Sequence, residues 1–125
     1  MTRDQLFEYI KIEFGTEPEY LFRDTPNTAV LRNPSGKWYG ILMDIPRSRL
    51  GLKGNEITDI LNVKLDPLLI GSLLGNSGMY PAYHMNKTHW ISINLEEIPD
   101  IEDIKDLLDM SYQMTGKTKR PHPDW

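Results

Sequence analysis

The sequence contains no cysteine, which excludes disulfide bonds, thiolate metal sites and a cysteine nucleophile. It has no apolar run near the ~18 residues that a membrane-spanning helix requires. Its first residues, Met-Thr-Arg-Asp-Gln, lack the apolar core of a signal peptide. Because a chain without disulfides suits a reducing compartment, we expect a cytoplasmic protein that is not inserted into a membrane.

The charge of the chain is unevenly distributed. The formal net charge of −4 gives little general affinity for nucleic acid, because neutralisation of phosphates supplies most non-specific binding. From Thr28 to Gly54, however, there are five basic residues and one acidic residue, and from Glu96 to Asp109 there are seven acidic residues and one basic residue. The sequence therefore permits a locally basic surface on an acidic protein.

The first half of the chain predicts a helix, a hairpin and a third strand. Thr2 and Gln5 have capping-box spacing, and Leu6 and Ile10 follow with helical periodicity up to Gly15. After a proline-containing loop, strands are expected over 29–32 and 37–45, joined by an Asn-Pro-Ser-Gly turn. Alternating apolar residues then predict a half-buried strand over 59–65.

The second half predicts two more helices around a pair of strands. Asp66 and Pro67 have the residue types of an N-cap and a first helical position. A strand is expected over 89–95, with 83–85 pairing beside it, and a last helix from 99–100 to Gly116. The order α-β-β-β-α-β-β-α predicts a two-layer α+β fold, with an antiparallel sheet, helices on one face, and the opposite face or the hairpin tips open to a partner. We assign 1–116 to this single domain, since about 100–150 residues is a common domain size, and 117–125 to a polar tail.

The stretch from Pro81 to Ile93 has the highest density of polar and aromatic groups. Two histidines, His84 and His89, lack a third ligand at useful spacing, so we expect no metal and no cofactor. His89 with Lys87 has the residue types of an acid–base site, but no nucleophile accompanies them and we expect no enzyme. The structural alternative is that Asn86 holds a tight turn while His89 and Trp90 pack against the last helix.

The same stretch resembles the MmcQ/YjbR family of small bacterial proteins. The family pattern is a Tyr, then Met-Asn-Lys, one residue, His-Trp and a strand, followed by a helix whose end reads Ser-Tyr. The matching positions here are Tyr83, Met85, Asn86, Lys87, His89, Trp90, Ser111 and Tyr112. The stretch from Val63 to Pro67 also looks like the family's strand-to-helix junction. The resemblance implies a frataxin-like or secretion-chaperone-like fold and a double-wing mode of DNA contact.

Basic residues interleaved with aromatic residues point to the same partner. Phosphate contact combined with stacking uses these side-chain types. We name as the candidate DNA-binding residues Arg32, Lys37, Trp38, Arg47, Arg49, Lys53 and Lys87. The favoured hypothesis is a DNA-binding or DNA-associated module without enzymatic activity. The alternative is a protein-interaction or small-ligand-binding domain that uses the open sheet face.

Overall fold

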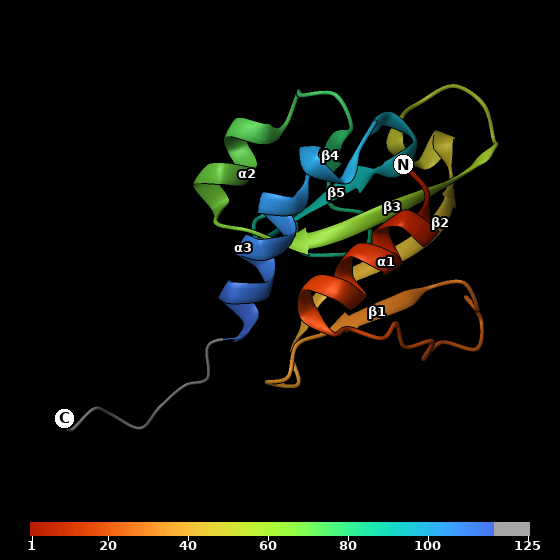
Figure 1. Ribbon diagram of the computed structural model, residues 1–125. Helices are drawn as coiled ribbons and strands as arrows, with labels where there is room; N and C mark the ends of the chain where they lie inside the picture. Colours follow the sequence, from red (N-terminus) through yellow and green to blue (C-terminus); the bar gives the residue numbers. More distant parts are fainter. Residues whose placement is uncertain (117–125) are drawn as a thin grey trace.

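The computed structural model describes residues 1–116, in which five strands form one antiparallel sheet (Figure 1). The strands lie in the order β1-β2-β3-β5-β4. In chain order the helices and strands are α1 (Arg3–Phe14), β1 (Ala29–Arg32), β2 (Trp38–Pro46), β3 (Ile57–Lys64), α2 (Pro67–Leu73), β4 (Met79–Pro81), β5 (Trp90–Asn94) and α3 (Lys105–Gly116). The predicted order of elements is confirmed. The predicted tail, 117–125, lies outside the described residues.

Helices α1 and α3 lie on one face of the sheet (Figure 1). The sheet residues that face them are set by the register, in which Ala29 pairs with Leu42, Leu42 with Leu61, and Leu61 with Ile93. These side chains are buried together with Leu6 and Ile10 of α1, Leu108 of α3 and Ile104, which directly precedes α3. The predicted two-layer α+β fold is therefore confirmed.

The helix ends follow the expected capping chemistry. The Thr2 hydroxyl accepts from the Gln5 amide, the Gln5 side chain accepts from the Thr2 amide, and Gly15 ends α1 in the left-handed region at φ 67°. The Asp66 side chain accepts from the Leu68 amide at the start of α2. The last helix differs slightly from expectation, because Asp100 caps a separate 3₁₀ turn, η3 (Ile101–Asp103), before α3 begins.

A β-bulge at Tyr39 determines how α3 is attached to the sheet. The β1–β2 register shifts between Leu31 and Arg32, and the β2–β3 ladder ends at the pair of Gly40 and Val63. The next residues along the two strands are Tyr39 and Lys64. Here the Ser111 hydroxyl of α3 donates to the Tyr39 carbonyl (2.6 Å) and accepts from the Lys64 amide (2.9 Å). The buried hydroxyl therefore stands between two strands where a direct ladder bond is absent.

Aromatic rings join α1, β2 and α3 next to this hydroxyl. The Tyr112 ring stacks on Phe14 with 4.1 Å between centroids and meets Tyr39 edge-on at 5.0 Å. Tyr39 is fully buried, and its hydroxyl lies 2.6 Å from the Thr16 hydroxyl. Ser111 and Tyr112, singled out by the family resemblance, thus belong to the packing of the helices on the sheet.

The prediction of an open second sheet face is wrong. Side chains on that face are buried. Segments 17–28, 47–56 and 82–89, which we call the loop layer, line pockets together with residues of this face or of β4. The buried side chains of the face include Val30, Ile41, Ile60, Asn62, Ser92 and Asn94. For the same reason β3 is buried on both faces rather than half-buried. The second sheet face carries Val30, Ile41 and Ile60, so it would expose a large apolar area to solvent if the loops did not cover it.

The prediction that residues 83–85 pair beside the strand at 89–95 is also wrong. Residues 79–81, rather than 83–85, pair with β5, where Met79 lies opposite Ile93 and Pro81 opposite Ile91. The ladder stops there because Tyr83 donates its amide to the Ser92 hydroxyl (2.9 Å), and His84 turns the chain with a positive φ of 59°.

Replacement of Ser111 by alanine tests the bridge between α3 and the two strands. The Tyr39 carbonyl and the Lys64 amide lose this buried partner in Ser111→Ala, so we expect a loss of about 1–3 kcal/mol in the free energy of unfolding. Urea denaturation measures it. Ser72→Ala is the matched control, because the exposed Ser72 hydroxyl bonds only within α2. Equal stability of the two variants would contradict the assigned role.

The buried Tyr39 hydroxyl predicts a loss of stability at high pH. Burial raises the pKa of Tyr39 to about 12, whereas an exposed tyrosine has a pKa of about 10. Since the folded state holds this proton more tightly than the unfolded chain, its contribution is complete below pH ~10 and is lost as the pH rises towards ~12. We expect the free energy of unfolding to decline less steeply over this interval in Tyr39→Phe. An identical decline in both proteins, measured by urea denaturation, would refute this.

Candidate functional site

The segment 82–89, which we call the motif loop, is fastened to the second sheet face through buried polar groups. The Asn62 amide nitrogen donates to the Tyr83 carbonyl (3.1 Å), and the Ser92 hydroxyl accepts from the Tyr83 amide (2.9 Å). Ser92 also donates to the Asn62 side-chain oxygen. Asn62 and Ser92 are fully buried, so this network fixes the start of the motif loop relative to β3 and β5.

Asn86 holds the turn in the middle of the motif loop, as the sequence predicted. Its side-chain oxygen accepts from the Thr88 amide (2.8 Å), and its carbonyl accepts from the amides of His89 (3.2 Å) and Trp90 (2.9 Å). Asn86 therefore shapes the loop, and the exposed side chains of His84, Lys87 and His89 are the ones available to a partner.

The predicted packing of His89 and Trp90 against the last helix is wrong. Ile91 and Ile93 of β5 face the helices, so the alternation of a strand directs Trp90 to the opposite face. Trp90 is half-buried there, and His89 is exposed.

A cationic pocket lies on one side of the motif loop. It has a volume of about 490 Å³ and is lined by Arg49, Leu50, Tyr80, Pro81, Ala82, Tyr83, His84 and Lys87. No acidic side chain is among these lining residues. The Tyr80 hydroxyl at its wall donates to Glu97 (2.5 Å), and burial together with this carboxylate raises the pKa of Tyr80 to about 12. The proton of the Tyr80 hydroxyl is therefore already engaged by Glu97, and the pocket offers the side chains of Arg49 and Lys87 to an anion.

An apolar pocket lies on the other side of the motif loop. Its volume is about 360 Å³, and it is lined by Phe22, Thr25, Thr28, Trp38, Ile41, Met43, His84 and Met85. The Phe22 and Trp38 rings meet edge-on with 6.1 Å between centroids. His84 lines both pockets, so the two are neighbours along one surface.

The structure divides the predicted basic residues into two groups. Arg32 is engaged with Glu19 (2.9 Å) and with the Gly36 carbonyl, and Arg47 lies 2.8 Å from Glu96 and 3.5 Å from Glu56. These two arginines hold loops in place. Within residues 1–116, no ion pair is found for the exposed cations Lys37, Arg49, Lys53 and Lys87.

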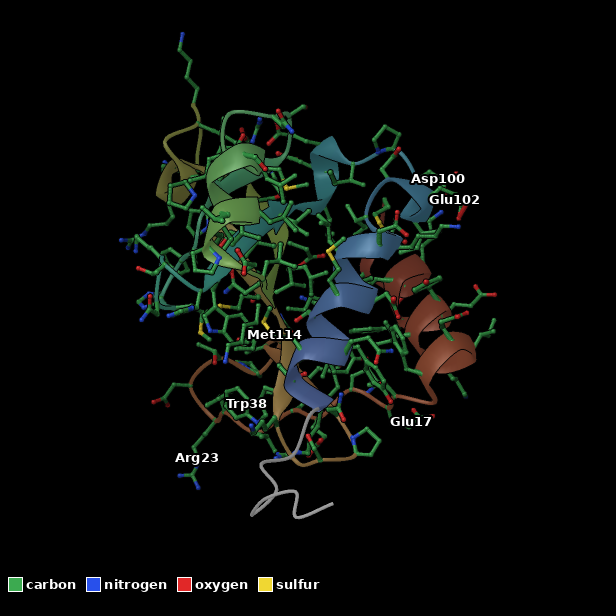
Figure 2. The ribbon with its side chains drawn as sticks, turned by 90° about the vertical axis from the view of Figure 1, so that its left-hand side faces the viewer. Glu17, Arg23, Trp38, Asp100, Glu102 and Met114 are labelled. Atoms are coloured by element: carbon green, nitrogen blue, oxygen red, sulfur yellow. The ribbon has the colours of Figure 1, made fainter. Side chains whose placement is uncertain are left out.

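Acidic residues are concentrated in the segments that contain α1 and α3. Segments 1–17 and 96–116 have eleven acidic and three basic residues, whereas 18–95 has six acidic and eight basic residues. In Figure 2, Asp100 and Glu102 lie beside α1, and Trp38 and Arg23 lie on the other side of the view, with Arg23 extended into solvent. The loop layer, in which Glu17 is counted again, has five basic and four acidic residues, so it repels an anion less than the helical side does.

Sequence reasoning missed several residues that line the pockets, among them two aromatic ones. Phe22 and Thr25 come from the segment before β1, and Tyr80 from the short strand β4. An aromatic residue in a loop with two prolines was the available signal for Phe22, but nothing in the sequence shows that this loop crosses to Trp38.

Residues 1–116 contain neither a cluster of metal-ligating side chains nor a membrane-spanning helix. No group of three or more His, Cys, Asp or Glu side chains in this part of the chain is placed to hold a metal ion. None of its helices has the length and apolar character needed to cross a bilayer.

Comparisons with known proteins place the chain in a family. The YjbR family model matches residues 14–114, well beyond the motifs recognised from Val63 onwards. The uncharacterized protein YyaQ of Bacillus subtilis (strain 168) is 40% identical over 116 residues, which are 92% of this chain and 98% of that protein.

Solved structures show the same fold. A crystal structure of a Pseudomonas syringae protein has a TM-score of 0.88 at 39% identity, over 92% of this chain and 99% of that chain. A solution NMR structure of a Pseudomonas syringae protein has a TM-score of 0.86 at 36% identity, over 100% of both chains. A crystal structure of a Deinococcus radiodurans protein has a TM-score of 0.66 at 25% identity, over 94% of this chain and 83% of that chain. On the family match, the identity to YyaQ and these structures, the chain belongs to the YjbR family.

Proposed function

We propose that this protein is a DNA-binding module without enzymatic activity, which contacts the phosphate backbone with its loop layer. The observation that carries the proposal is the set of three exposed cations, Arg49, Lys53 and Lys87, none of which has an ion-pair partner among the described residues. A cation without a protein partner is free to neutralise a phosphate and to release the counterions bound there.

The distribution of charge supports contact through this layer. With eleven acidic residues in 1–17 and 96–116, the helical side repels a polyanion, so DNA is oriented towards the loops. Arg23, on segment 17–28, adds an exposed cation to the same layer (Figure 2), and Lys37 is an exposed cation directly after the hairpin turn. The negative net charge of the protein then limits its non-specific affinity for DNA, but it does not prevent phosphate contacts at the loop layer.

The paired arginines have a supporting role in this proposal. The Arg32–Glu19 pair ties segment 17–28 to β1, and the Arg47–Glu96 pair ties η1 (Arg47–Leu50) to the chain after β5. A guanidinium already engaged by a carboxylate is a poor phosphate ligand, because binding would first have to break that pair. We therefore omit Arg32 and Arg47 from the predicted phosphate contacts.

Substitution of the unpaired cations tests the proposal. Each of Arg49→Gln, Lys53→Gln and Lys87→Gln should weaken binding to duplex DNA and lower the slope of log K against log salt by about 1. The three together should lower affinity at low salt by at least about tenfold. Fluorescence anisotropy of a labelled duplex, titrated from low to physiological salt, measures both quantities.

Lys11→Gln is the control of equal net charge, because it removes one exposed cation from α1 on the helical side, where Lys11 pairs with Glu17 (3.6 Å). It should leave the salt slope unchanged. If Lys11→Gln and Lys87→Gln lowered the salt slope equally, the effect would come from net charge alone. That result would contradict contact through the loop layer. An absence of binding by the unmodified protein at low salt would reject the DNA proposal itself.

A further inference from the structure

We infer that the apolar pocket and the cationic pocket together form one binding site for a small amphiphilic organic anion. An alkyl chain or aromatic ring would occupy the apolar pocket, and a carboxylate or phosphate monoester would lie against Arg49 and Lys87. This inference shares Arg49 and Lys87 with the DNA proposal, and it differs from it in the apolar pocket, of which a phosphate backbone makes no use.

The apolar pocket has the size and lining of a small-molecule site. Its volume of about 360 Å³ falls within the ~300–1,000 Å³ typical of ligand pockets. Ile41 and Met43 come from the second sheet face, Met85 from the motif loop, and Trp38 and Phe22 add two aromatic rings. Methionine side chains adapt to ligands of irregular shape, which favours a flexible apolar group over one particular ring.

The neighbouring pocket supplies the charge for the other end of such a ligand. Arg49 comes from η1 and Lys87 from the motif loop, and no carboxylate lies among the lining residues. An Arg guanidinium binds a carboxylate or phosphate with paired N–H donors, and Lys adds a point charge. Electrostatic complementarity therefore selects an anionic head group over a neutral or cationic one.

His84 joins the two pockets and is held in an uncommon backbone conformation. Its φ of 59° lies in the left-handed region that non-glycine residues seldom adopt. The Tyr83 backbone, fixed by Asn62 and Ser92, precedes it, and the Tyr83 and His84 rings meet edge-on with 4.0 Å between centroids. Backbone strain of this kind persists where surrounding contacts impose it, often at binding sites. Here it holds the imidazole at the wall shared by the pockets.

The test uses four ligands that share a twelve-carbon chain. Dodecanoate and dodecyl phosphate, below their micelle concentrations, should bind in isothermal titration calorimetry and shift the backbone amide NMR signals of His84 and Met85. Dodecanol and dodecyltrimethylammonium should bind at least about tenfold more weakly, because they lack the anionic group. The ratio of the first two affinities distinguishes a carboxylate site from a phosphate site. Comparable binding of dodecyltrimethylammonium would overturn the inference.

Variants assign the two ends of the ligand. Arg49→Gln with Lys87→Gln should weaken dodecanoate binding by about tenfold or more. Thr25→Phe, at an exposed position that lines the apolar pocket, should fill the pocket and abolish binding of the dodecyl chain. Undiminished binding in either variant would contradict the site.

Lys53→Gln separates this inference from the DNA proposal. Lys53 lines neither pocket, so its loss should leave dodecanoate affinity unchanged while it weakens duplex binding. Thr25→Phe should do the reverse. Failure to bind dodecanoate with duplex binding intact would reject only the amphiphile site, whereas the opposite result would reject only DNA binding.

Discussion

The arrangement of this fold depends on a single buried hydroxyl, that of Ser111. The bulge at Tyr39 leaves a carbonyl of β2 and the Lys64 amide of β3 without a direct bond to each other, and Ser111 joins them to α3. With α3 fixed there, Tyr112 stacks on Phe14 and holds α1 on the same face of the sheet. All helical packing on the sheet faces is thereby confined to one side, and the other side is left to be covered by loops.

On the second face, the motif loop is held by hydrogen bonds among buried polar groups rather than by packed aromatic rings. Asn62 and Ser92 replace the apolar side chains expected in the centre of a covered sheet, and they bond the backbone of Tyr83. An unpaired polar group in this position would be costly, so the motif loop is held in register with β3 and β5. The family residues consequently divide into those that build the scaffold, Asn86 and Ser111 among them, and exposed ones such as Lys87.

Local signals in the sequence predicted the elements, and long-range contacts determined where the predictions failed. The capping box at Thr2 and the N-cap at Asp66 depend on neighbours within a few residues, so they could be predicted from the sequence. The loops that cover the second sheet face could not be predicted, because Phe22 approaches Trp38 only after the chain has folded. The ion pair of Arg47 was not predictable for the same reason, since its partner Glu96 lies on a distant segment. The cationic pocket likewise brings Arg49 and Lys87 together from separate loops.

On the proposal made above, the loop layer and not the helical layer is the functional surface. Amide chemical-shift mapping of the isotopically labelled protein, titrated with a short DNA duplex at low salt, distinguishes the two surfaces. We expect the shifted signals to belong to segments 47–56 and 82–89, including Arg49, Lys53 and Lys87. Shifts concentrated on α1 or α3, or a spectrum unchanged by duplex at low salt, would contradict it.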